Sequence, residues 1–385
     1  MILRPYGVLL AGKIVPGVEL QIENGAIAEI RPHTGLPEPF LVSPPFVNAH
    51  SHLEYRNLMG KIAESEYWPW IREITTLKQS ESPEQVLQAC RIAAAENRTT
   101  GVGFIAEHTD RPGAAQAMNE TGLAGMLFQE LITFNEMDSP QSKRESVIQK
   151  QAISAESGFP VFLAPHAPYT VDRATLEWAT SQSERLSIHV AETTFEREFF
   201  AHQSGPIAEF YQAFGRPIPS AESPVAYLNE LGMMKSGTQL VHCCDVSESD
   251  LELIARSGSS IAHCPRSNIA LKCPVAPVRR MLEAGIPVGI GLDSAASSGE
   301  IDFFAEIRCA VQSSIQIHEP ISAETVWNLA TVAGAASLGI ENWEISVGRS
   351  GELIKIHGAH VDRTADLIEI ASPKDIEWIN LAQIA

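Results

Sequence analysis

Short apolar segments alternate with longer stretches of helical character through the middle of the chain. Helix starts are marked by capping residues, as at residues 83–97, where Ser82 caps the first turn, Pro83 opens it and Gln85 completes a capping box. Eight apolar segments are expected to be buried strands: residues 46–49, 102–106, 125–128, 161–164, 186–189, 240–242, 260–262 and 288–291. Eight strands separated by helices predict an α/β fold, a (β/α)8 TIM barrel, which typically needs about 250 residues. The alternative is an open doubly wound sheet, but no glycine-rich phosphate fingerprint follows the first strand.

The two ends of the chain have a different, β-rich pattern. Apolar and polar residues alternate over 18–23, and Asn24-Gly25 then supplies the turn of a hairpin. Near the other end, residues 351–357 and 364–370 are expected to be strands. We therefore expect three parts: residues 1–43 and 345–385 build one small β-sandwich from both termini, and residues 44–344 form the barrel between them. The alternative is a pair of unrelated tails.

Composition narrows the class of protein. The 385 residues include 28 Lys+Arg and 47 Asp+Glu, which gives a formal net charge of -19. This acidic balance argues against a nucleic acid or an anionic membrane as the partner and favours a small-molecule substrate. No stretch of 18 apolar residues appears, and the six cysteines form no CxxC pair. A cytoplasmic protein in a reducing compartment is expected.

Histidines gather where the predicted strands end. The twelve histidines of the chain include seven at these positions: His50, His52, His108, His166, His189, His242 and His263. In a TIM barrel the chemistry is carried by the C-terminal ends of the strands. A single histidine at a strand end is more often a hydrogen-bonded polar group than a ligand, but seven together predict a functional site.

Four of these strand-end residues have the chemistry of a metal site. His50 and His52 are two residues apart, so both side chains leave the same face of a strand. His189 offers a third imidazole and Asp293 a carboxylate. This ligand set suits Zn²⁺, Fe²⁺ or Mn²⁺ and leaves a position for water, whose pKa such an ion lowers from 15.7 to roughly 7. A divalent metal ion is expected, with zinc preferred over iron or manganese.

The strand-end motifs resemble those of a known family. They are Phe46–Glu54, His166–Tyr169, His189–Glu192, Val241-His242, Cys264–Asn268 and Gly291–Ser294. Together they resemble the amidohydrolase superfamily, in its branch of nucleoside and aromatic-heterocycle deaminases and chlorohydrolases, whose architecture includes a sandwich made from both termini. The resemblance implies that His50, His52, His189 and Asp293 are the metal ligands. It also implies a single ion, because His166 stands where dinuclear relatives have a bridging lysine, and a possible homodimer, because relatives are often dimers.

The resemblance also implies catalytic roles for Glu192, His242 and Asp293. Asp293 accepts a proton from the bound water, Glu192 protonates the ring nitrogen, and His242 orients the water or the tetrahedral intermediate as metal-bound hydroxide attacks C6 and ammonia leaves. Glu192 lies three residues beyond His189, so on an unbroken strand it would face away from the metal. It reaches the water only if the chain bends after the strand; otherwise it is a solvated loop carboxylate.

The substrate is suggested by finer resemblances. The pairing of His50–Glu54 with Cys264–Asn268 most resembles aminodeoxyfutalosine deaminases of menaquinone biosynthesis. The same deaminases are also resembled at three further places: Trp68–Arg72, Phe128–Glu130 and Asp245. The predicted substrate is therefore a 6-aminopurine nucleoside, with aminodeoxyfutalosine first. Adenosine, methylthioadenosine and S-adenosylhomocysteine deaminases share most of the remaining pattern and stay as alternatives.

Two further alternatives come from other classes. A chlorohydrolase-type hydrolase of another N-heterocycle would keep the site, but a halide departs without a proton, so Glu192 favours ammonia as the leaving group. A barrel that has lost activity is disfavoured because Glu192, His242 and Asp293 are all present.

Substrate contacts are expected from five residues at or near the strand ends: Glu54, Glu130, His166, Arg266 and Ser294. Their alternative role is to hydrogen-bond one another or to fix loops. Trp68 and Trp70 either stack on a purine or belong to the core. Residues 195–237 either cap the substrate or simply pack. Pro44-Pro45 and residues 271–273 depart from the family pattern, which affects the pocket and leaves the metal ligands untouched.

Overall fold

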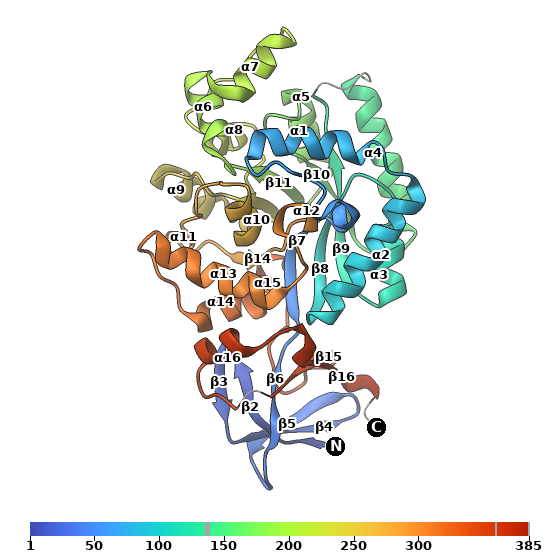
Figure 1. Ribbon diagram of the computed structural model, residues 1–385, viewed down its shortest axis with the longest axis vertical. Helices are drawn as coiled ribbons and strands as arrows, with labels where there is room; N and C mark the ends of the chain where they lie inside the picture. The colour runs from blue at the N-terminus through green and yellow to red at the C-terminus, as the bar shows by residue number, and fades with distance from the viewer. Residues whose placement is uncertain (135–138, 359, 384–385) are drawn as a thin grey trace.

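The largest feature of the computed structural model, which describes residues 1–134, 139–358 and 360–383, is an eight-stranded parallel sheet. Each strand pairs with its neighbour in the sequence, and helices surround the sheet (Figure 1). The strands are β7 (Phe46–Ser51), β8 (Val102–Thr109), β9 (Ala124–Leu131), β10 (Val161–Pro165), β11 (Leu186–Val190), β12 (Thr238–His242), β13 (Ser260–His263) and β14 (Val288–Ile290). All eight predicted strands are confirmed, and the fold is a TIM barrel.

The sheet is closed where its first and last strands meet. The backbone N–H of Asp293, just beyond β14, donates to the carbonyl of His50 at 2.9 Å, and the N–H of His52 donates to the carbonyl of Asp293 at 3.3 Å. The side chain of Asn48 on β7 reinforces this seam, because its Oδ1 accepts from the N–H of Leu292 at 3.0 Å. The closure therefore uses the residues that carry the predicted metal ligands.

An outer layer of helices follows the strands. Its members are α2 (Pro83–Thr99), α3 (Ala114–Thr121), α4 (Pro140–Ala155), α5 (Arg173–Gln182), α9 (Glu248–Ser257), α11 (Val278–Glu283), α13 (Phe303–Gln316), α14 (Ala323–Leu329) and α15 (Val332–Ser337). The predicted start of α2 is confirmed, since Ser82 and Gln85 form the capping box. No helix in the described part of the chain is both long and apolar enough for a membrane span.

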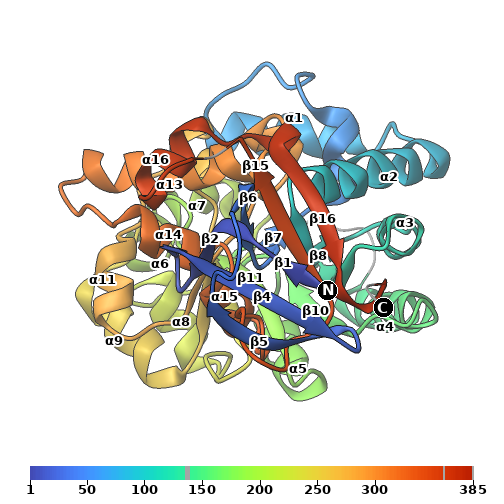
Figure 2. The same ribbon diagram turned by 90° about the horizontal axis from the view of Figure 1, so that it is seen from below.

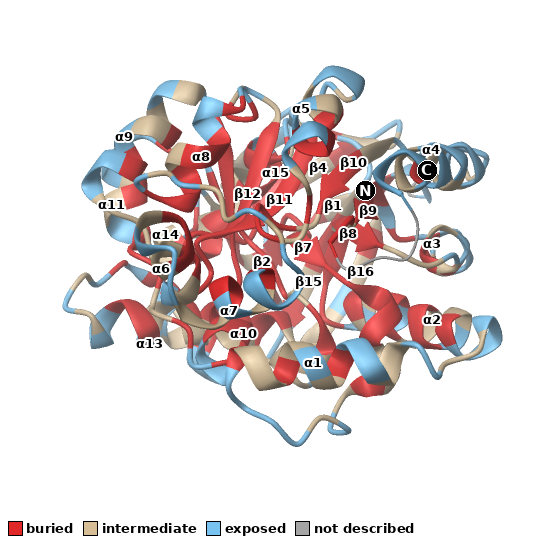
Figure 3. Cartoon of the chain, turned by 90° about the horizontal axis from the view of Figure 1, so that it is seen from above, coloured by how far each residue is buried: buried red, intermediate tan, exposed pale blue. Residues whose placement is uncertain are grey.

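Additional short helices lie around the C-terminal ends of the barrel strands. They are η1 (Leu53–Leu58), α1 (Tyr67–Lys78), α6 (Thr194–His202), α7 (Gly205–Ala213), α8 (Pro224–Glu230), α10 (Pro265–Ala270) and α12 (Ala295–Ser298). In Figure 1, α1 crosses the mouth of the barrel and α6, α7 and α8 stand beside it. Seen from above, buried residues gather at the centre of the barrel (Figure 3). These helices therefore form the walls around the strand ends.

The two termini build separate sheets at the opposite end of the molecule (Figures 1 and 2). One sheet has the order β1-β4-β5 and the other β16-β15-β6-β2-β3, so the second combines strands from both termini. Asn24 and Gly25 have φ of 52° and 74°, which confirms the hairpin turn between β4 and β5. The strands are β1 (Ile2–Leu3), β2 (Pro5–Leu10), β3 (Lys13–Pro16), β4 (Val18–Glu23), β5 (Ala26–Pro32), β6 (Glu38–Ser43), β15 (Glu352–His357) and β16 (Ile376–Asn380). The domain limits at residues 43 and 344 stay a prediction.

The predicted strand at residues 364–370 was wrong, because this segment is helix α16 (Thr364–Ile370). Its buried residues are Thr364, Leu367 and Ile368, which are three and four positions apart. That spacing is the period of a helix rather than a strand. The C-terminal partner strand of β15 is instead β16, which begins six residues after α16 ends and lies between the 3-10 helices η2 (Pro373–Asp375) and η3 (Leu381–Gln383).

The lower half of the barrel interior is apolar. Val47, Met126, Phe128 and Ala164 come from the three strands β7, β9 and β10 and pack with Leu338, which follows α15. This cluster lies next to the polar strand ends, since the ring of Phe128 stacks on that of His108 with 4.8 Å between the centroids.

Replacing Asn48 with alanine tests the closure of the barrel. The Asn48 amide also donates to Asn97 Oδ1 at 3.1 Å, so its loss leaves buried polar groups on both sides without a partner. We expect the free energy of unfolding to fall by about 1–3 kcal/mol, measured by urea denaturation. Asn57→Ala is the control, because Asn57 donates to the carbonyl of Gln85 at the surface and water replaces that bond. Equal losses in both variants would contradict the role of Asn48.

Candidate metal centre and active site

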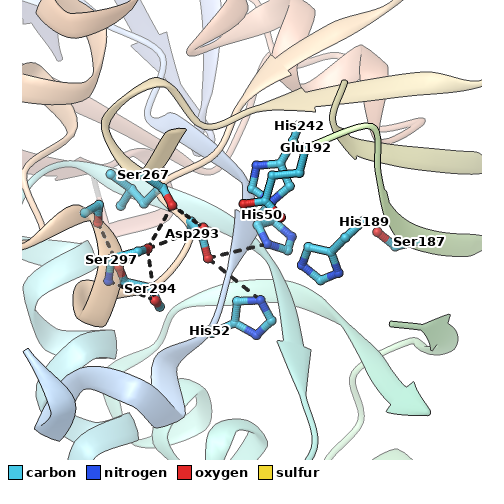
Figure 4. Close-up of polar contacts among 12 residues, drawn as sticks. His50, His52, Ser187, His189, Glu192, His242, Ser267, Asp293, Ser294 and Ser297 are labelled. Carbon is cyan, nitrogen blue, oxygen red and sulfur yellow. Dashed lines mark hydrogen bonds and ion pairs between the residues drawn. The ribbon is translucent and has the colours of Figure 1, made fainter. Parts of the chain in front are cut away.

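The end of β7 and the residue after β14 bring three predicted ligands together. His50 Nε2 lies 3.8 Å from Asp293 Oδ1, and His52 Nε2 lies 3.9 Å from the same oxygen (Figure 4). The bridge between Ser51 and Asp293 that closes the barrel places these side chains side by side. His50 is fully buried and His52 is 7% exposed.

The third imidazole comes from β11. The ring of His189 lies 4.9 Å from that of His50 and 5.5 Å from that of His52, measured between centroids. His189 Nδ1 lies 2.8 Å from the carbonyl oxygen of His166, and a carbonyl only accepts, so Nδ1 carries the proton. The other nitrogen, Nε2, is therefore left with a lone pair for a metal ion.

This cluster has the chemistry of a metal site. Burial, with the neighbouring imidazoles adding to it, lowers the pKa of His50 and of His52 well below the usual range. Burial also lowers the pKa of His189 to about 4, so that all three rings are neutral at pH 7. Both ring nitrogens of His50 and Nδ1 of His52 have no hydrogen-bond partner among the described residues. Buried lone pairs without partners are costly unless something binds them, and a divalent cation satisfies them.

Asp293 is held so that one oxygen faces the imidazoles. Ser267 donates a hydrogen bond to Asp293 Oδ2 at 2.6 Å, which leaves Oδ1 directed at His50 and His52 (Figure 4). Asp293 has a φ of 58°, a left-handed conformation that turns its side chain inward. Burial raises the pKa of Asp293 to about 6, although the hydrogen bonds of Ser267 and Ser297 oppose the shift.

The chain bends after β11, as the placement of Glu192 requires. Ala191 has a φ of 52°, and the N–H groups of Ala191 and Glu192 donate to the Glu196 carboxylate at 3.0 and 2.8 Å. The bend turns Glu192 toward the cluster, where its Oε1 lies 3.5 Å from His242 Nε2. Burial, with the charge of Asp293 adding to it, raises the pKa of Glu192 well above its usual value, and the Tyr67 hydroxyl opposes this by a hydrogen bond.

His242 is oriented by Asn268. The Asn268 amide donates to His242 Nδ1 at 2.9 Å, so the ring proton is on Nε2, the atom that faces Glu192. A protonated Nε2 donates hydrogen bonds and does not bind a metal ion. In this arrangement His242 Nε2 donates a hydrogen bond beside the metal cluster and is not a metal ligand. Its ring is nevertheless close to the cluster, with ring nitrogens of His50, His189 and His242 within 4.8 Å of one another.

A cavity of about 720 Å³ opens above these residues, a size typical of small-molecule sites. Of the predicted substrate contacts, Glu130, His166 and Ser294 line it. Glu130 Oε1 is buried without a hydrogen-bond partner among the described residues, and burial raises the pKa of Glu130 to about 8. The remaining wall includes seven aromatic residues: Tyr55, Tyr67, Trp68, Trp70, Phe134, Tyr169 and Phe210.

Two predicted substrate contacts do not line the cavity. Glu54 is fully buried and accepts hydrogen bonds from Thr109 Oγ1 and from the N–H of Arg111, so it holds the loop after β8. Arg266 donates to the carbonyl of Glu300 at 2.8 Å and fixes the loop after β13. Both side chains act in loop structure, the alternative that the sequence left open for them.

The segment 195–237 contributes little to the cavity. Phe199 and Phe200 are fully buried and pack against the rings of Tyr211 on α7 and Tyr227 on α8. Phe210 is the residue of this segment that lines the cavity among those described. The segment mainly packs, and Trp68 and Trp70 contribute to the cavity wall and to the core.

Sequence reasoning missed several supporting residues. Ser267 and Glu196 orient Asp293 and the bend at Glu192, and Tyr67 reaches Glu192 from α1. Ser267 lies inside the Cys264–Asn268 motif and was therefore within reach of the sequence. Glu196 and Tyr67 have no local pattern that singles them out, because their roles depend on elements that meet in space.

Known proteins are similar to this chain over nearly its whole length, in sequence and in fold. The 5-methylthioadenosine/S-adenosylhomocysteine deaminase of Desulforudis audaxviator is 27% identical over 408 residues, which covers 98% of this chain and 91% of that protein. An adenosine deaminase from Xanthomonas campestris with bound zinc has a TM-score of 0.84 at 22% identity, over 99% of this chain and 91% of that one. The aminofutalosine deaminase of Helicobacter pylori has a TM-score of 0.83 at 21% identity, over 99% and 98%.

Most of the chain matches one protein family. The model described as "Amidohydrolase family" matches residues 41–377, which include the whole barrel and every residue of the cluster around Asp293. By this match the chain belongs to the amidohydrolase family and is a hydrolase acting on carbon–nitrogen bonds.

Proposed function

We propose that this protein is a metal-dependent deaminase that replaces the 6-amino group of a purine nucleoside with oxygen, with aminodeoxyfutalosine as its substrate. The observation that carries the proposal is the position of the Glu192 carboxyl. It lies 3.5 Å from His242 Nε2 and faces the cavity beside the cluster of His52, His189 and Asp293. A proton-transferring carboxyl next to a metal cluster is the arrangement that hydrolytic removal of ammonia requires.

The proposed ligands of the metal ion are His50, His52, His189 and Asp293, and zinc is the proposed ion. Three neutral imidazoles and a carboxylate suit Zn²⁺, Fe²⁺ and Mn²⁺. When bound, such an ion acidifies water, lowering its pKa from 15.7 to roughly 7. The zinc found in the structurally similar adenosine deaminase supports the choice of ion.

The side chains of the site divide the proton transfers between them. Asp293 accepts a proton from the attacking water, since Ser267 leaves its Oδ1 directed into the cluster. Glu192, whose pKa burial raises, delivers a proton to the ring nitrogen beside C6. His242 donates from Nε2 to the oxygen that adds to C6. The amino group then takes up the proton that Asp293 accepted, and ammonia leaves.

The choice of nucleoside rests on the relatives and on the motifs. The Helicobacter pylori structure is named as an aminofutalosine deaminase, and two similar proteins, at 27% and 26% identity, are named as 5-methylthioadenosine/S-adenosylhomocysteine deaminases. The second candidate activity is therefore deamination of methylthioadenosine or S-adenosylhomocysteine. Dechlorination of a heterocycle is disfavoured, because a halide leaves without a proton and this reaction has less need of a proton donor such as Glu192. A cytoplasmic location, a homodimer and a place in menaquinone biosynthesis stay predictions.

Ammonia release by the metal-loaded protein tests the reaction and its substrate together. The panel is aminodeoxyfutalosine, adenosine, methylthioadenosine, S-adenosylhomocysteine, guanine and a chlorotriazine. We expect the highest kcat/KM with aminodeoxyfutalosine. A higher kcat/KM with another 6-aminopurine would keep the mechanism and change the substrate, whereas no ammonia from any of them would overturn the proposed function.

Substitutions at Glu192 and His189 separate proton transfer from metal binding. Glu192→Gln keeps the size of the side chain and removes its acid, so we expect bound metal to be retained and kcat to fall by about 10²–10⁴-fold. His189→Ala removes a ligand, so we expect both metal and turnover to be lost. Metal content by elemental analysis and initial rates check this. Full activity in Glu192→Gln would remove the proton-transfer role.

Ser267→Ala tests the orientation of Asp293. Without the hydrogen bond at 2.6 Å, the carboxylate is free to turn away from the imidazoles. Loss of a residue that orients a ligand typically costs about 10–100-fold in metal affinity, and we expect that range in competition with a chelator. Ser298→Ala is the matched control, since Ser298 Oγ donates to the carbonyl of Ser294 and does not touch Asp293. An unchanged affinity in Ser267→Ala would show that Asp293 is oriented by other contacts.

A further inference from the structure

One wall of the cavity is rich in cations. We call it the basic end and define it by the five lining residues Arg72, Lys78, Arg111, Lys143 and Lys150. The whole chain has 28 lysine and arginine residues and a net charge of -19, so a general excess of basic side chains does not explain five of them in one cavity.

Two of these cations share a single carboxylate. Lys78 Nζ lies 3.4 Å from Asp110 Oδ2, and Lys150 Nζ lies 3.3 Å from Asp110 Oδ1. Asp110 is ionised, because Lys78 and Lys150 together outweigh the effect of burial and lower its pKa. The three groups therefore carry one net positive charge at the cavity wall.

The other acidic groups nearby pair with Arg111, whereas Asp110 is the carboxylate that pairs with the two lysines. Arg111 Nη1 lies 3.1 Å from Glu81 Oε2, and Arg111 Nε lies 3.8 Å from Glu54 Oε2. Lys78 stays charged, since Asp110, Glu130 and Glu54 raise its pKa although burial opposes them.

The basic end and the metal cluster belong to different parts of the barrel mouth. Lys78 is the last residue of α1, Lys150 lies on α4, and Asp110 follows β8, whereas the metal cluster is built on β7, β11 and the segment after β14. Glu130 at the end of β9 lines the same cavity and lies beside the metal cluster, since its carboxylate is within 4.8 Å of the ring nitrogens of His52 and His189.

We infer that the basic end binds a carboxylate carried on the 5′ substituent of the nucleoside. The inference rests on the proposed function, in which the amino-bearing ring lies at the metal cluster and the ribose and its 5′ position extend away from it. A carboxylate beside Lys78 and Lys150 completes the charge balance that Asp110 leaves open and makes charge-assisted hydrogen bonds to two ammonium groups.

The same charges select against a substituent that also carries an ammonium group. Asp110 already accepts from two lysines, so an added ammonium would lie beside two cations without a carboxylate of its own. The substrate class is a 6-aminopurine nucleoside with an anionic 5′ substituent, which sets aminodeoxyfutalosine above the zwitterionic S-adenosylhomocysteine and above the neutral methylthioadenosine.

The test is the ratio of kcat/KM for aminodeoxyfutalosine to that for methylthioadenosine in Lys78→Met and Lys150→Met. Each substitution leaves Asp110 paired with one remaining lysine and removes the net positive charge. We expect the ratio to fall about 10–100-fold in each variant, with the change mainly in KM for the carboxylate. Lys374→Met is the matched control, because Lys374 is exposed on η2, beside the terminal sheets, and we expect the wild-type ratio there.

A binding measurement keeps the result independent of turnover. In a metal-loaded Glu192→Gln background, calorimetry should show the Kd of aminodeoxyfutalosine rising with Lys78→Met, and rising in the parent when ionic strength increases from about 0.05 to 0.5 M. An unchanged kcat/KM ratio in both lysine variants would overturn the carboxylate site. So would a Kd of aminodeoxyfutalosine that stays the same after Lys78→Met and after the increase in ionic strength. Absence of ammonia from every purine, with aminodeoxyfutalosine still bound in a lysine-dependent way, would overturn the proposed reaction and leave the carboxylate site standing.

Discussion

The closure of the barrel between β7 and Asp293 is the interaction on which the rest of the site depends. Two backbone hydrogen bonds link Asp293 to His50 and His52, and the same three residues supply three of the proposed metal ligands. A barrel has no free edge, so every strand end is fixed relative to the others. The distances from Asp293 to His50 and His52, which lie more than 200 residues earlier in the chain, are therefore set by the barrel and not by flexible loops.

Burial and bent strand ends together prepare the site for chemistry. Removal from water keeps the imidazoles neutral and raises the pKa values of Glu192 and Asp293, which is the direction that metal binding and proton transfer require. Ala191, His242 and Asp293 adopt left-handed backbone conformations that cost of order 1–3 kcal/mol each for residues with a side chain. Hydrogen bonds from Asn268 and Ser267, and those accepted by Glu196, hold these bends in place.

Chemistry and recognition are carried by different elements. The metal cluster and Glu192 lie on strand ends, where the barrel fixes them, whereas the basic end is built largely from α1, α4 and the loop after β8. Helices and loops outside the barrel change without disturbing its closure, which explains how one fold supports deaminases of several nucleosides. The 27% identity to a methylthioadenosine/S-adenosylhomocysteine deaminase is consistent with a shared reaction and leaves the substituent on the ribose to be decided locally.

The sequence by itself determined the barrel, the terminal sheets and the grouping of His50, His52, His189 and Asp293, which are the proposed metal ligands. Apolar strands and the histidines that follow them are local patterns, so both can be recognised from residues that are adjacent in the sequence. It failed at residues 364–370, where Leu367-Ile368 suits a strand as well as one face of a helix, and packing against the barrel decided for the helix. It also placed Glu54 and Arg266 in the cavity, because nothing local shows that Glu54 instead holds the loop after β8 or that Arg266 reaches Glu300. The shared carboxylate of Lys78 and Lys150, and the contact of Tyr67 with Glu192, were decided by the tertiary structure alone, since each joins segments that only the folded barrel brings within a few ångströms.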